Sequence, residues 1–129
     1  MRLAIVAAIV TAMVFCMAFT ARTASAADVL AGQTVFNRCK ICHKIEANQR
    51  STVGPNLHGI FGRKAGTLDG FAGYSEPMKN AGIVWNDETL GKYLRDPKGF
   101  LPGTNMAFPG LKNDVDVANL LAYLHQAAQ

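Results

Sequence analysis

Two thiols and an imidazole stand close together in the run Cys39-Lys40-Ile41-Cys42-His43. One turn of chain can place both thiols under the two vinyl groups of a single porphyrin, where they form thioethers. The adjacent His43 can then offer its imidazole to the iron from the same side of the ring. This C-x-x-C-H pattern is typical of covalent haem c attachment, and it predicts one such haem on this chain.

Three other uses of the same residues fit the sequence less well. A thioredoxin-like redox pair would require a βαβ context, which the sequence lacks. A zinc site would require a second pair of ligands, whereas His58 and His125 are isolated. A disulfide would leave the adjacent histidine unexplained, and its short loop would constrain little of the unfolded chain.

The second axial ligand of the iron must come from elsewhere in the chain. Met106 lies in an extended segment, Pro102–Gly110, that can approach a haem without a helix in the way. Met78 falls in a segment with helical character and is expected to serve packing. His58 and His125 are expected to be exposed to solvent, and an iron without a sixth protein ligand is a further alternative.

The pattern of apolar residues and caps predicts an all-α fold. The segment Gly54–Gly73 is rich in glycine and shows no period, so it is expected to be a long loop that wraps a non-protein core. The segment Pro97–Gly110 is expected to hold no helix because of its density of proline and glycine. Helices are predicted for Asp28–Lys40, Ser75–Gly82, Asn86–Asp96 and Asn113–Ala127.

Gly32 lies on the apolar face of the first predicted helix, where glycine costs about 1 kcal/mol relative to alanine. A close helix crossing, against Leu120 or Tyr123 of the last helix, would explain it. The alternative is a helix that simply tolerates a glycine.

Residues 1–26 read as a secretory signal. Arg2 precedes an apolar run, Leu3–Phe19, and Ala24-Ser25-Ala26 is a small-residue cleavage site, with cleavage after Ala26 or Ala27. The expected location is the periplasm, with residues 27–129 as one domain; an uncleaved signal would instead anchor the chain in a membrane.

The overall charge argues against a nucleic-acid partner. The chain has 13 Lys and Arg against 9 Asp and Glu, and two of the basic residues, Arg2 and Arg22, belong to the predicted signal. The rest of the chain is nearly balanced, whereas nucleic-acid-binding domains carry a basic stripe.

Several motifs of this chain, in order, resemble those of the class I cytochromes c. The resemblance implies the cytochrome c fold, with three main helices and long loops around a haem held by His43 and Met106. It also implies that the Pro55 carbonyl supports the His43 ring and that Tyr93 forms a hydrogen bond near the Met106 sulfur. The motifs are Cys39–His43, Gly54–Lys64, Trp85, Tyr93-Leu94 and Pro102-Gly103-Thr104-x-Met106.

The same resemblance implies that Arg63, Tyr74, Trp85 and Thr104 hold or neutralise the haem propionates. The chain departs from the mitochondrial pattern at Met78, where an asparagine usually lies near buried water. The ring of lysines around the haem edge is thin. Arg38, Lys98 and Lys112 match it, while Gly99 and Asn105 replace lysines.

With two permanent axial ligands, the resemblance implies an electron carrier and not an enzyme. The expected partners are a cytochrome bc1-type donor and an oxidase, reductase or photosynthetic reaction-centre acceptor. The protein is expected to be a monomer and to contact membranes only through these complexes. Two alternatives remain: a haem enzyme or gas-binding protein with an open sixth position, and a haem-free binding module stabilised by a disulfide.

Overall fold

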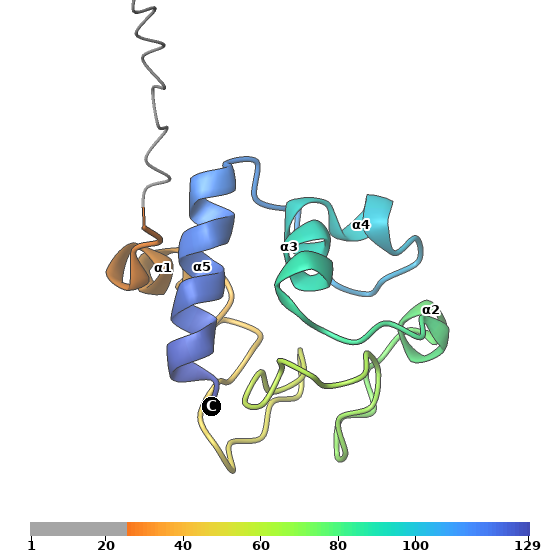
Figure 1. Ribbon diagram of the computed structural model, residues 1–129. Coiled ribbons are helices and arrows are strands. Elements are labelled where there is room, and N and C mark those ends of the chain that lie inside the picture. The colour runs from red at the N-terminus through yellow and green to blue at the C-terminus, as the bar shows by residue number, and fades with distance from the viewer. Residues whose placement is uncertain (1–25) are drawn as a thin grey trace, which may run out of the picture.

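A computed structural model describes residues 26–129, so the predicted signal lies outside the described residues except for Ala26. Figure 1 shows helices and long connecting loops, and within the described range the backbone forms no strand apart from an isolated bridge between Lys64 and Val84. The all-α prediction is therefore confirmed. The helices are α1 (Val29–Phe36), α2 (Glu76–Asn80), α3 (Asp87–Arg95), α4 (Pro97–Phe100) and α5 (Asp114–Ala127).

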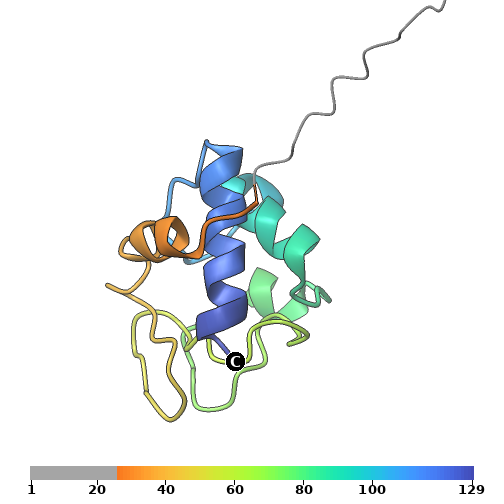
Figure 2. The same cartoon turned by 60° about the vertical axis from the view of Figure 1, so that its left-hand side comes forward.

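The first and last helices cross at close range (Figure 2). A Cβ atom on Gly32 would overlap the backbone carbonyl of Asn119 and lie 2.8 Å from the Cβ of Tyr123. The expected close crossing is thus present, with Asn119 in place of Leu120. The Asp28 backbone N–H donates to Asn119 Oδ1 at 2.7 Å, and the ring centroids of Phe36 and Tyr123 lie 5.3 Å apart.

The capping residues explain where three of the helices begin. Asn86 and Thr89 form a reciprocal capping box at the start of α3, and the Asn113 side chain accepts from the Val115 N–H at the start of α5. The Ser75 hydroxyl accepts from the Met78 N–H at the start of α2. These three helices agree with their predicted ranges.

Two helix predictions need correction. The first helix ends at Phe36 rather than Lys40, because Arg38 and Cys39 donate to the third residue before them instead of the fourth. A helical turn, α4, also forms in the segment expected to have none. Pro97 is its first residue, where the missing N–H is not needed, and Asp96 Oδ1 accepts from the Gly99 N–H at 3.0 Å.

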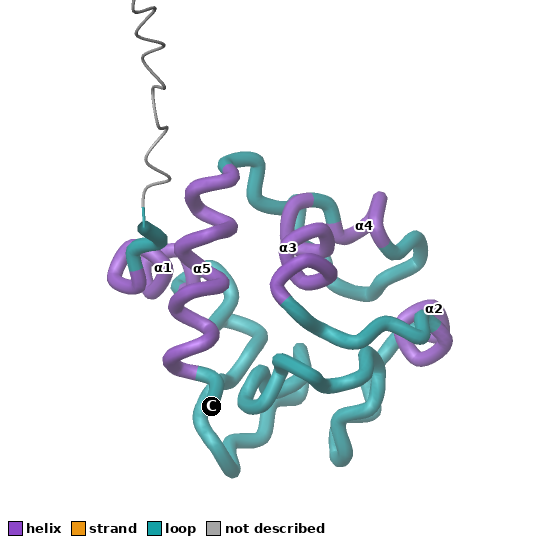
Figure 3. Tube along the Cα trace, viewed as in Figure 1, coloured by secondary structure: helices purple, strands orange, loops and turns teal. Residues whose placement is uncertain are grey.

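Figure 3 shows that the chain between α1 and α3 is mostly loop, interrupted by the short α2. Side chains of these loops, of α3 and of α5 pack together in one buried core. Val117, Leu120 and Leu124 of α5 are almost fully buried, as are Leu94 of α3 and Ile60 of the loops. Among residues 26–129, no helix is long and apolar enough to span a bilayer.

Candidate haem site

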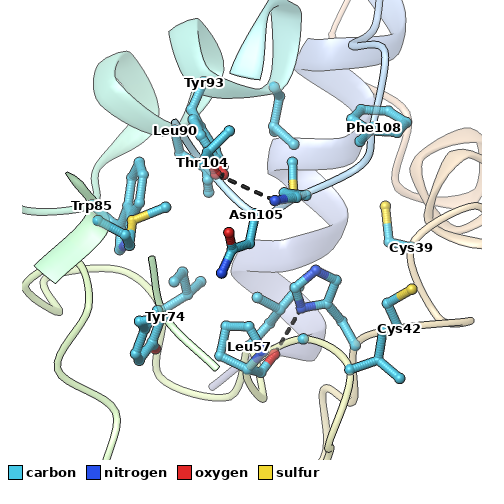
Figure 4. Close-up of a pocket in the computed structure, with 18 of the residues that line it drawn as sticks. Cys39, Cys42, Leu57, Tyr74, Trp85, Leu90, Tyr93, Thr104, Asn105 and Phe108 are labelled. Atoms are coloured by element: carbon cyan, nitrogen blue, oxygen red, sulfur yellow. Dashed lines mark hydrogen bonds between the residues drawn. The ribbon is translucent and has the colours of Figure 1, made fainter. Parts of the chain in front are cut away.

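The fold encloses a cavity of about 300 Å³ between α3, α5 and the loops (Figure 4). Its lining is mostly apolar, and it includes ten residues that the sequence singled out for a haem site. These are Cys39, Cys42, His43, Pro55, Arg63, Tyr74, Trp85, Tyr93, Thr104 and Met106. Neither His58 nor His125 lines it, whereas Met78 does.

Cys39 and Cys42 reach this cavity from the turns that follow α1. The N–H groups of Cys42 and His43 both bond to the Cys39 carbonyl, at 3.0 and 2.9 Å, which curls the motif into one tight turn. Both thiols are half-buried and are not joined to each other. Burial raises the pKa of Cys39 to about 11, against the opposing effect of nearby Arg38. A thiol held neutral in this way is a poor redox nucleophile, which argues against a thioredoxin-like role.

The imidazole of His43 is fixed by the segment around Pro55. Its Nδ1 lies 2.7 Å from the Pro55 carbonyl oxygen, so Nδ1 carries the proton and donates to it. Gly54 leaves room for the ring, because a Cβ there would lie 2.6 Å from His43 Cε1. Burial lowers the pKa of His43, and the bond to Pro55 opposes that shift. The neutral tautomer therefore has its free lone pair on Nε2, as a metal-ligating histidine requires.

Met106 lies on the segment that follows α4, and that segment is held by α3. The Tyr93 hydroxyl lies 2.7 Å from Thr104 Oγ1, and the Met106 N–H donates to the same oxygen at 3.4 Å. Burial raises the pKa of Tyr93, which keeps its hydroxyl neutral. Tyr93 is therefore linked to Met106 indirectly, through Thr104, which lies two residues before Met106 in the chain. The Leu111 N–H donates to the Leu94 carbonyl at 2.8 Å, which ties the far end of the segment to α3.

Arg63, Tyr74 and Trp85 line another part of the cavity. The Arg63 guanidinium donates to the carbonyls of His58 at 3.1 Å and Asn56 at 2.9 Å. Burial lowers the Arg63 pKa and raises that of Tyr74, and each group partly offsets the shift of the other. The Trp85 ring is buried beside Tyr93, with centroids 5.2 Å apart. These three side chains bring a cation and two aromatic rings with polar ends to the cavity.

Sequence reasoning missed several residues that shape the cavity. The motif Gly54–Lys64 includes Gly54 but does not reveal that its missing side chain leaves room for the His43 ring. Phe108, Leu120 and Leu124 also line the cavity, and the apolar period of the last helix could have pointed to the two leucines. Asn105, which the resemblance placed at the haem edge only as a replaced lysine, also lines the cavity.

These groups fit a covalent haem. Two thiols, an imidazole with a free Nε2 and a thioether face one apolar cavity, and a cation and two aromatic side chains with polar tips lie at another part of it. A zinc site would require several His, Cys, Asp or Glu side chains close together. Among the described residues, no group of three or more such side chains is placed to hold a metal ion.

The chain matches known proteins over nearly all of this domain. The cytochrome c family model matches residues 29–128. Cytochrome c2 of Blastochloris viridis is 45% identical over 112 residues, 87% of this chain and 87% of the relative. Cytochrome c2 iso-2 of Magnetospirillum fulvum is 54% identical over 89 residues, 69% of this chain and 91% of the relative.

A solved structure agrees with this assignment. Cytochrome cH from Methylobacterium extorquens superimposes with a TM-score of 0.71 at 41% identity, covering 77% of this chain and 98% of that one. The chain therefore belongs to the cytochrome c family, as a class I c-type cytochrome that carries covalent haem c and transfers electrons rather than catalysing a reaction.

Proposed function

We propose that this cytochrome is a periplasmic carrier of single electrons whose haem iron is held between His43 and Met106. The observation that carries the proposal is the convergence of that imidazole and that thioether, from segments far apart in sequence, on the cavity that also holds both thiols. When bound, the haem supplies an iron that alternates between Fe(II) and Fe(III). Thioethers formed by Cys39 and Cys42 would keep it in place.

The residues of the chain have distinct tasks in this scheme. The Pro55 carbonyl orients the His43 ring and raises its basicity as a ligand. The soft sulfur of Met106 and the apolar lining both favour Fe(II), which raises the reduction potential. Because two side chains would occupy both axial positions, no position is left for a substrate, as a carrier requires.

We assign the polar group at the cavity to the haem propionates. Arg63 is a half-buried cation, and Tyr74 is the ionisable group whose charge most affects its pKa. Together with Trp85 and Thr104, they would hold or neutralise the propionates. The Thr104 hydroxyl is also engaged with Tyr93, so it would have to share its hydrogen-bonding capacity.

We also propose a location and redox partners for this cytochrome. Residues 1–26 would direct export and be removed, leaving residues 27–129 as a monomeric domain in the periplasm. A cytochrome bc1-type complex would donate the electron, and an oxidase, reductase or reaction centre would accept it. Cationic side chains near the cavity, such as Arg38, would favour acidic docking surfaces on these partners.

Redox titration of Met106→Ala tests the ligand assignment. We expect the reduction potential to fall by more than about 59 mV, because loss of the thioether weakens the preference for Fe(II) at least tenfold. Met78→Leu, which removes the other methionine sulfur at the cavity, is the matched control and should leave the potential nearly unchanged. An unchanged potential in Met106→Ala with a large fall in Met78→Leu would move the ligand to Met78.

A further inference from the structure

The cavity has two sides that are separate in sequence, and one hydrogen bond crosses between them. Asn105 Nδ2 donates to the Gly73 carbonyl at 3.3 Å, across 32 residues of chain. Within residues 26–129, it is the only hydrogen bond that joins segment 101–110, which carries Met106, to segment 54–75. Figure 4 shows Asn105 reaching from the side of Thr104 toward the side of Tyr74.

Both partners of this bond lie at the rim of the cavity. Asn105 and Gly73 line it and are exposed to solvent, so the bond lies between the cavity and bulk water. Asn105 also directly precedes Met106, so the bond ties the backbone next to the thioether to the opposite segment.

The acceptor of this bond lies among packed aromatic side chains. Phe71 packs edge-on against Tyr74 with centroids 4.9 Å apart, and a Cβ on Gly73 would lie 2.7 Å from the Phe71 ring. The Gly73 carbonyl is therefore held by its aromatic neighbours. One residue before Thr104, Gly103 packs so closely on the Pro77 ring that a Cβ would lie 2.9 Å from its Cγ. The Met106 segment therefore packs on Pro77 of α2 and forms its one hydrogen bond to segment 54–75 through Asn105, within residues 26–129.

We propose that Asn105 is a positioning residue whose amide holds the Met106 segment closed across the rim of the cavity. The inference rests on the proposed ligation by Met106. An exposed bond of 3.3 Å is weak, so it limits how often the segment opens without preventing opening. Each opening would release the thioether from the iron and admit a small ligand from solvent.

The test uses the ferric haem-loaded protein and imidazole, a neutral nitrogen ligand whose approach is insensitive to charge. At saturating imidazole, the stopped-flow rate of ligand exchange reports how often Met106 leaves the iron. Asn105→Ala should raise that rate about two- to tenfold, the range expected for one hydrogen bond. Asn105→Asp keeps the shape but removes the donor, and it should raise the rate at least as much.

Asn80→Ala is the matched control, because Asn80 is exposed and its side chain makes no hydrogen bond within the described residues. The sulfur-to-iron charge-transfer band should persist in all resting proteins, which shows that Met106 is still bound. If this band is present and all four exchange rates agree, the role of Asn105 is wrong while the ligation stands. If the wild type lacks the band and binds imidazole without saturation, the ligation itself fails and the role of Asn105 fails with it.

Discussion

At the scale of single residues, the site depends on hydrogen bonds that fix the two proposed ligands. The Pro55 carbonyl sets the tautomer of His43 directly. Met106 is fixed less directly, through Thr104, whose hydroxyl meets both Tyr93 and the Met106 N–H. The position of Met106 therefore depends on the partly buried hydrogen bond between the Tyr93 and Thr104 hydroxyls. Substitutions of Tyr93 should change the position of the Met106 sulfur.

Tyr93→Phe should lower the free energy of unfolding by about 1 kcal/mol at neutral pH, the usual loss for one buried hydrogen bond. It should also alter the dependence of stability on pH. Burial raises the pKa of Tyr93 in the folded protein, so the unfolded chain loses this proton first as pH rises past its ordinary value of 10.0. The stability that the raised pKa of Tyr93 contributes is fully present below pH 10.0 and is lost as the pH rises above it.

Urea unfolding of the ferrous protein between pH 8 and pH 11 measures both effects. The wild type should lose stability more steeply than Tyr93→Phe at the alkaline end. Some slope should remain in the variant, because burial also raises the pKa of Tyr74. Parallel curves for the two proteins would show that Tyr93 does not couple folding to pH.

At the scale of elements, the sequence predicted best the helices whose ends carry their own caps. Asn86, Asn113 and Ser75 mark the starts of α3, α5 and α2 because a side-chain oxygen next to free N–H groups is a local signal. The error at α4 has a local cause too, since Pro97 was counted as a helix breaker although it suits the first position of a helix.

Residues that one short motif holds together could be placed at the cavity from the sequence, whereas contacts between distant segments could not. The placement of Cys39, Cys42 and His43 at one cavity follows from their spacing along one turn. The meeting of Asn105 with Gly73 depends on how two loops fold against each other, which no local period encodes. Arg63 likewise donates to two carbonyls of its own loop, and no motif or period in the sequence indicates those partners.

Gly32→Ala should destabilise the protein although alanine is the better helix former. Alanine gains about 1 kcal/mol in helix propensity, but its Cβ would overlap the Asn119 carbonyl and force α1 away from α5. The overlap is with backbone atoms, so the cost should lie at the upper end of the usual range for overpacking, about 1 to 3 kcal/mol. After the gain in helix propensity, we expect a net loss of about 1 to 2 kcal/mol in the free energy of unfolding. Gln33→Ala, at an exposed position of the same helix, should stabilise slightly. Equal stability of Gly32→Ala and wild type would show that the crossing can relax.

At the scale of the whole molecule, the surface carries a modest and scattered positive charge. Lys98 is exposed, while Lys112 donates to the Arg95 carbonyl at 3.1 Å, and Arg95 pairs with Asp114 at 2.7 Å. Lys79 and Lys92 pair with Glu76 and Glu88 on their own helices. Three cations are thus paired with neighbouring carboxylates, and the chain outside the predicted signal has only two more basic than acidic residues, so long-range steering of a partner should be weak.

Electron transfer to an acidic partner should slow as ionic strength rises, but only modestly, because exposed charges are screened beyond about 10 Å at 0.1 M salt. The double variant Lys98→Ala/Lys112→Ala should be slower than wild type at low salt and equal to it at high salt. Lys92→Ala, on a paired side chain, is the control. Stopped-flow oxidation over a salt series measures this, and a rate that rises with salt would exclude steering by these lysines.

The central claim is a covalent haem with one histidine and one methionine ligand. The most direct test is a redox-monitored visible spectrum of the purified exported protein, followed by extraction with acidified acetone. We predict that the haem stays with the polypeptide and that the ferric protein shows the sulfur-to-iron charge-transfer band, which disappears in Met106→Ala. Extractable haem would contradict attachment through Cys39 and Cys42, and a ferric spectrum without that band would contradict ligation by Met106.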